Sequence, residues 1–194
     1  MSDRMAAEIW IGGGVPKRLV PQLCGAICSE GTSLGWDEAL FAPGNAAELL
    51  EACRDQDGVR LLHLCNVEAC WGEFGELEEF LVQRRIGFRR RSEARYEHDA
   101  QIIEFRPGIG PVRYPTDSSG KPYVPLTDLI QAASWLDQAV ESANGKSAGQ
   151  LLSQLRNVRR LVRRSLPLVV PPLGPFEIVQ QVAAKAHANR RGKT

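Results

Sequence analysis

Hydrophobic residues recur along the chain with the periods of both strands and helices. Alternating or continuous apolar runs predict strands over residues 7–11, 34–41, 59–65, 88–96 and 101–105. Apolar residues three and four positions apart predict helices over residues 16–29, 45–53, 73–86, 126–143, 150–165 and 176–187. Strands and helices do not alternate throughout, and the last two strands form a hairpin. The order favours an α+β fold with a mixed or mainly antiparallel sheet, helices packed on one face, and a C-terminal helical appendage.

Short polar signals mark the ends of several of these elements. Asn45 is predicted to cap the second helix with Glu48 as its reciprocal partner, and Asp57-Gly58 is a natural turn. Gly87 is expected to end the helix over 73–86. In the strand over 88–96, one face is expected to be half-buried and the other densely charged.

Composition places the chain among ordinary globular proteins. It has 194 residues, of which 43% are hydrophobic and 24% charged, enough for one main domain and an appendage. A linker-like stretch over 144–149 separates a predicted acidic α+β domain, residues 1–145, from a predicted basic helical segment, residues 146–194.

The two segments carry opposite charge, which the overall net charge of +1 hides. Residues 1–145 hold 14 Lys and Arg against 22 Asp and Glu, and residues 146–194 hold 10 against one. Concentrated charge of this kind attracts polyanions or oppositely charged protein surfaces, so it bears on partners and names no reaction.

The helix over 150–165 is the source of the candidate nucleic-acid-binding residues. Its aliphatic residues project on one side, and the other side carries Arg156, Arg159, Arg160, Arg163 and Arg164. Its apolar side has no Trp or Phe, which disfavours a membrane surface as partner. The four tryptophans lie outside the basic segment, so base reading has no support, and contact with nucleic-acid backbone and docking on acidic protein are favoured almost equally.

A second cluster of arginines surrounds the strand over 88–96. Glutamates of the preceding helix and of the strand itself lie nearby and are expected to neutralise most of these charges.

The glycine run between the first strand and the first helix is a candidate anion site. Gly13 and Gly14 would offer backbone N–H groups, and Lys17 and Arg18 would add positive charge. The run matches neither common phosphate-binding glycine pattern, so a plain strand-to-helix turn is the favoured interpretation.

Metal and catalytic chemistry have weaker support. A metal site would have to use His63 and the five cysteines, namely Cys24, Cys28, Cys53, Cys65 and Cys70, but paired zinc-ligand spacings are missing and buried structural cysteines are favoured. His63, His98 and His187 lie in no recognisable nucleophile signature, and Tyr96-Glu97-His98-Asp99 is interpreted as a solvated hairpin tip. We therefore expect no metal, no cofactor and no catalytic residue.

The cellular setting is inferred from what the sequence lacks. Its cysteines are odd in number, no apolar run reaches the ~20 residues that cross a bilayer, and the N-terminus lacks an apolar core. A cytoplasmic protein with reduced thiols and no membrane partner is expected.

No motif identifies a family, and the charge division leads to the first functional hypothesis. It is a non-enzymatic accessory or adaptor subunit that binds a protein partner through its α+β body and nucleic acid or a ribonucleoprotein through the basic helix. One alternative is a protein-docking module whose basic helix pairs with acidic protein surface. A further alternative, which keeps an enzyme open, is binding or conversion of a phosphorylated small molecule at the Gly12–Gly14 turn.

Overall fold

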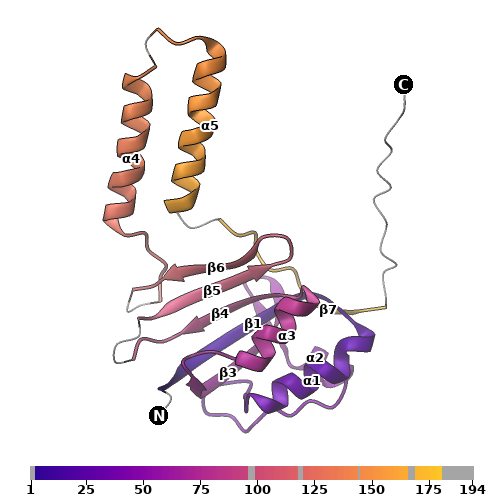
Figure 1. The fold of residues 1–194 in the computed structure, drawn as a ribbon. Coiled ribbons are helices and arrows are strands. Elements are labelled where there is room, and N and C mark those ends of the chain that lie inside the picture. The colour runs from indigo at the N-terminus through magenta and orange to yellow at the C-terminus, as the bar shows by residue number, and fades with distance from the viewer. Residues whose placement is uncertain (1–2, 96–98, 118–119, 144, 166–168, 181–194) are drawn as a thin grey trace, which may run out of the picture.

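The computed structural model describes residues 3–95, 99–117, 120–143, 145–165 and 169–180, and its centre is one twisted sheet (Figure 1). The strands are β1 (Arg4–Pro16), β2 (Cys53–Gln56), β3 (Val59–Cys70), β4 (Gly87–Ser92), β5 (Gln101–Arg106), β6 (Gly110–Pro115) and β7 (Phe176–Val179). Their order is β2-β3-β1-β4-β5-β6 with antiparallel neighbours, and β7 pairs in parallel with the end of β1. The predicted α+β fold with a mainly antiparallel sheet is confirmed.

The helices fall into two groups (Figure 1). They are the short 3-10 turn η1 (Lys17–Leu19), α1 (Val20–Ser29), α2 (Ala46–Glu51), α3 (Gly75–Arg84), α4 (Leu126–Glu141) and α5 (Ala148–Ser165). The first group, up to α3, lies along one face of the sheet, whereas α4 and α5 form a helical pair that projects beyond the β6 edge. The appendage expected at the C-terminal end is present as this pair.

The core lies between the sheet and the helices α1 and α3. Alternate residues of β1 point into it, so that Ala7, Ile9 and Ile11 are fully buried. Leu64 and Leu62 lie opposite Ile9 and Ile11 on β3 and complete the same layer. Leucines and isoleucines of α1 and α3 pack against them, and each such side chain contributes about 1.5–3 kcal/mol through burial.

The glycine run does not form the turn expected from the sequence. Gly12, Gly13 and Gly14 lie within β1, which continues to Pro16 before the helix region begins. A Cβ at Gly12 would collide with the carbonyl oxygen of Gly174, so glycine is needed where the returning chain crosses the strand. Gly13 has a φ of 87°, which favours glycine, and its N–H donates to the carbonyls of Gly174 and Pro175, both at 3.0 Å.

The helix predicted over 176–187 is wrong for its first part. Phe176–Val179 forms β7 alongside Gly13–Pro16, and the rest of the predicted helix lies mostly outside the described residues. Phe176 and Ile178 face the core at a spacing of two, as in a strand, whereas a helix would have turned Ile178 and Val179 inward together. The open edge of backbone groups at the end of β1 therefore decides the structure of this segment.

Among the predicted helix ends, turns and short strands, some are confirmed and others are wrong. The side chain of Asn45 caps α2 by accepting from the N–H groups of Ala47 at 2.9 Å and Glu48 at 3.1 Å, and the turn at 57–58 joins β2 to β3. The strand predicted over 34–41 does not form. In this region the only β-type pairings of the described residues are isolated bridges from Ser33 to Leu40 and to Cys65. The left-handed C-cap of α3 is Arg85 rather than Gly87, which begins β4.

The helices α4 and α5 pack on each other, with Ala132 and Val158 buried between them. Gln154 of α5 strengthens the pair by donating from Nε2 to the carbonyl oxygen of Ala139 at 2.8 Å. The predicted boundary between residues 145 and 146 lies in the turn of this hairpin, so the last helix assigned to the acidic domain packs on the first helix of the basic segment. The division into two domains stays a prediction.

One charged side chain lies inside the core layer. Arg90 points from β4 toward α3 and has 1% of its side chain exposed. Its Nε lies 2.7 Å from Glu78 Oε1 and its Nη2 lies 3.5 Å from Glu73 Oε1. Because a buried guanidinium is costly without a counter-charge, α3 and β4 are fixed to each other by this ion pair.

We expect Glu78→Gln to lower the free energy of unfolding by about 3 kcal/mol, because it leaves the Arg90 charge buried with a more distant partner. Urea unfolding followed by circular dichroism measures the change. Glu79→Gln, one position along the same helix and exposed, is the matched control and should change stability by less than about 0.5 kcal/mol. Equal effects of the two substitutions would contradict this role for the pair.

Candidate functional site

The predicted basic stripe lies along the outer side of α5. Arg156, Arg159, Arg160 and Arg163 are exposed, and Arg164 is in the last turn of the same helix, with its side chain outside the described part. Within the described ranges, none of the four guanidinium groups forms an ion pair with a carboxylate. Arg160 donates to Oδ1 of Asn157 at 2.7 Å, which orients it along the helix without neutralising it. The stripe is therefore open to an external anion.

An open groove runs beside the stripe. Lys146 and Arg160 line it, together with the neutral polar side chains of Gln150, Ser153 and Asn157. Donor groups of this kind suit phosphate oxygens, since ammonium and guanidinium groups offer only hydrogen-bond donors.

A second surface of the hairpin is apolar. Leu129, Leu136 and Val140 of α4 are 46%, 50% and 73% exposed, and Leu155 of α5 is 59% exposed. Their spacing along α4 places them on one side of that helix. Large apolar side chains gathered on one exposed surface are typical of a docking site.

The other predicted anion site loses its local basis. Lys17 and Arg18 are exposed in η1, directly after β1, but the N–H of Gly13 already donates to the returning chain. Gly14 pairs with Glu177 of β7 instead of opening a helix. Anion binding by Gly13, Gly14, Lys17 and Arg18 stays a prediction without the turn that motivated it.

Three arginines of β4, namely Arg89, Arg90 and Arg91, are paired with carboxylates, and two of them find their partners on other strands. Arg89 Nε lies 3.7 Å from Glu104 Oε1 on β5, and Arg91 Nη1 lies 3.5 Å from Glu8 Oε1 on β1. The sheet register creates these pairs, because Arg89 lies opposite Glu104 and Arg91 lies opposite Glu8.

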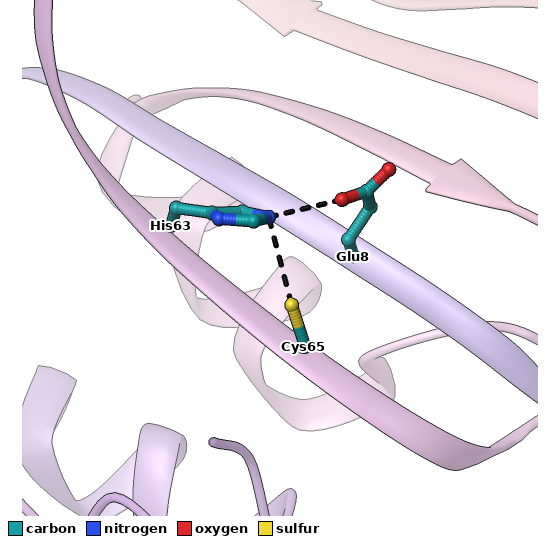
Figure 2. A group of neighbouring side chains, drawn as sticks. All are labelled: Glu8, His63 and Cys65. Atoms are coloured by element: carbon teal, nitrogen blue, oxygen red, sulfur yellow. Dashed lines mark hydrogen bonds and ion pairs between the residues drawn. The ribbon is translucent and has the colours of Figure 1, made fainter. Parts of the chain in front are cut away.

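A cluster of three chemically different side chains lies on the sheet face opposite the helix-covered core (Figure 2). The antiparallel register puts Glu8 opposite Cys65 and Trp10 opposite His63. Nε2 of His63 lies 3.0 Å from Glu8 Oε2 and 3.6 Å from Cys65 Sγ. Two neighbouring strands thus bring a carboxylate, an imidazole and a thiol together.

The surroundings of this cluster hold it in place. The ring of His63 stacks on Trp10 with centroids 4.8 Å apart and planes 5° from parallel, and Arg89 lies 5.7 Å from the centre of a Trp10 ring. Cys65 is fully buried, and burial together with the Glu8 charge raises the pKa of its thiol to about 11. At neutral pH the group is therefore a thiol rather than a reactive thiolate.

The cluster does not have the geometry of a nucleophile and base. In a catalytic triad the two imidazole nitrogens contact different partners, whereas here the same Nε2 faces both Glu8 and Cys65. Together with the protonated, buried thiol, this arrangement argues against covalent catalysis by Cys65.

The sequence singled out His63 and Cys65 but missed Glu8. Of the predicted hairpin tip Tyr96-Glu97-His98-Asp99, only Asp99 belongs to the described residues, and His187 lies outside them. Cys24 is buried, Cys28 is exposed, and all five cysteines are free thiols. Alternation along the first predicted strand could have placed Glu8 and Trp10 on one face, but which strand lies beside it is not encoded locally.

Comparison with known proteins assigns no family, because no protein-family model, curated protein or solved structure matches this chain. Among the described helices, none combines the length and the apolar character needed to span a bilayer. The function of the chain therefore has to be inferred from the chemistry of its own residues.

Proposed function

We propose that the chain is a non-enzymatic adaptor that binds the phosphate backbone of nucleic acid, free or within a ribonucleoprotein, through the basic stripe of α5. The observation that carries the proposal is the set of four exposed arginines without an ion pair in the described residues, on a helix that projects from the body (Figure 1). The body would contact a protein partner.

The positions of the arginines suit a linear polyanion. Arg156 and Arg160, and likewise Arg159 and Arg163, lie four residues apart, which places the four on one side of the helix. Guanidinium groups bind phosphate oxygens in pairs and stay charged at any physiological pH. Residues 1–145, which include α4, carry a net charge of −8, so a polyanion is repelled by this part of the chain and attracted by α5.

Backbone contact is favoured over base reading. Trp135 of α4 is half-buried, and no aromatic residue occurs in α5 that could stack on a base. Affinity should therefore depend strongly on salt and little on sequence.

We expect the full chain to bind a fluorescent DNA or RNA duplex with a steep salt dependence. The triple variant Arg156→Gln, Arg160→Gln, Arg163→Gln should reduce the slope of log affinity against log salt by about 2–3, since each lost phosphate contact contributes about 0.9. Fluorescence anisotropy at salt concentrations between about 50 and 200 mM measures this.

The matched control removes three positive charges from exposed arginine and lysine residues of the body. Arg84→Gln, Arg113→Gln, Lys121→Gln changes the net charge equally and should leave most of the slope in place. No binding by the wild-type chain at the lowest salt, or equal losses in the two triple variants, would rule out the proposed surface.

A second candidate function is protein docking through the hairpin, and the exposed apolar side chains of α4 and α5 favour it. The occupant that fits is a second copy of the chain, whose hairpin would stack on the first as in a four-helix bundle. Exposed Asp137 and Glu141 lie on α4, and the arginines lie on α5. If each α4 packs on the α5 of the other copy, the acidic residues of α4 meet the arginines of α5. If α5 packs on α5 instead, arginines meet arginines and repel one another.

In this second case we expect the wild-type chain to sediment as a dimer at micromolar concentration. The variant Leu129→Ser, Leu136→Ser, Val140→Ser should sediment as a monomer, because it removes exposed apolar contacts without touching the buried Ala132 and Val158. Leu40→Ser, Val67→Ser, Val82→Ser, which changes exposed apolar residues of the body, should stay dimeric. A wild-type monomer, or a control that dissociates equally, would exclude self-docking by the hairpin.

A further inference from the structure

We propose that Glu8, His63 and Cys65 form a binding site for a divalent transition-metal ion of the zinc type. Figure 2 shows the three side chains converging from β1 and β3, with the imidazole between the carboxylate and the thiol. The site is independent of the basic stripe on α5 and of the function proposed for it.

The distances between the ligand atoms suit such an ion. Nε2 of His63 is 3.0 Å from the carboxylate oxygen and 3.6 Å from the sulfur, and all three ligand atoms lie within 4.8 Å of one another. A tetrahedral zinc ion with bonds of about 2.0–2.3 Å separates its ligand atoms by about 3.3–3.6 Å. Small side-chain movements would therefore suffice to close the site around the ion.

The hydrogen-bonding capacity of His63 gives an independent argument. Nε2 of a neutral imidazole either carries a proton or a lone pair, so it cannot donate to Glu8 and accept from Cys65 at once. If it carries the proton, the thiol has lost its acceptor; if it does not, its lone pair faces the carboxylate. A cation at the point where the three groups meet would satisfy all of them together.

The scaffold around the ligands is rigid and supplies outer contacts. The ligands come from β1 and β3, which are neighbours inside the sheet: β2 pairs with the other side of β3, and β4 pairs with the other side of β1. Trp10 fixes the plane of the His63 ring, and Arg91 lies 3.5 Å from the carboxylate oxygen that does not face His63. Orienting contacts of this type are usual around metal ligands.

The mixed ligand set also selects the kind of ion. Thiolate and imidazole favour zinc and related transition metals over magnesium and calcium, which prefer oxygen. On binding, the Cys65 thiol would release its proton to solvent, and thiolate and carboxylate would then balance the two positive charges of the ion. Three protein ligands leave a fourth position for water or for a partner's side chain. The ion can enter beside Glu8 and His63, which are partly exposed, whereas Cys65 lies below them.

The test uses the full chain, freed of metal by a chelator and titrated with cobalt(II) as a spectroscopic probe and then with zinc. We expect one equivalent of cobalt to give a thiolate-to-cobalt charge-transfer band and the visible bands of a tetrahedral ion, and zinc to displace it. Zinc should also raise the melting temperature, because it binds the folded state.

The variants assign the site. Cys65→Ser should abolish the charge-transfer band, and Glu8→Gln should weaken cobalt binding by at least about 10–100-fold, the loss that even an outer-shell change produces. The variant Cys28→Ser, Cys70→Ser, which changes the two exposed thiols, is the control and should keep both band and affinity. Because Cys65 is fully buried, Glu8→Gln is the decisive variant if Cys65→Ser fails to fold. No band in the wild-type chain, a band retained by Cys65→Ser, or unchanged affinity in Glu8→Gln would overturn the proposal.

Discussion

The antiparallel pairing of β1 with β3 and β4 is the constraint on which the rest of the structure depends. It places Ile9 and Ile11 beside Leu64 and Leu62 on the core face. On the opposite face the same register puts Glu8 next to both Cys65 and Arg91. Because side chains alternate between faces, a slip of one residue would exchange the two sets and bury the charged groups in the core. Core and candidate metal site are therefore specified by one pattern of backbone hydrogen bonds.

The length of β1 has a second consequence for the molecule. The strand extends past its core residues through Gly12 and Gly13 to Pro16, and the chain that returns from α5 pairs with this extension. Arg106 adds a further attachment, since its Nε donates to the carbonyl oxygen of Pro171 at 2.8 Å. The helical hairpin leaves the sheet after β6 and is tied back at β1, so both of its ends are held although α4 and α5 pack mainly on each other.

Much of the fold could be predicted because its signals are local. The α3 helix, the buried run that became β3, the cap at Asn45 and the turn at 57–58 follow from periodicity and side-chain chemistry within a few residues. Two of the larger errors concern contacts between distant segments. Residues 176–179 became a strand because β1 offered them a partner, and the glycines at 12–14 serve a chain crossing from position 174. Glu8 escaped notice for the same reason, since its partners His63 and Cys65 lie 55 and 57 positions further along the chain.

The charge division of the sequence acquires a physical explanation from the pairing inside the body. An acidic body attracts a basic helix next to it, and contact between the two would neutralise the stripe. Several carboxylates of the body are already engaged by its own arginines: Glu78 by Arg90, Glu104 by Arg89, and Glu8 by Arg91. Residues 1–145 hold further carboxylates that α5 could meet, but an exposed ion pair contributes only about 0–1 kcal/mol. Such pairs would do little more than offset the lost freedom of the arginine side chains. Arg156, Arg159, Arg160 and Arg163 are accordingly exposed in the structure. The proposed polyanion differs from the body, because its phosphates are closely spaced and not already paired with protein cations, and binding it would release counterions that offset the ordering of these side chains.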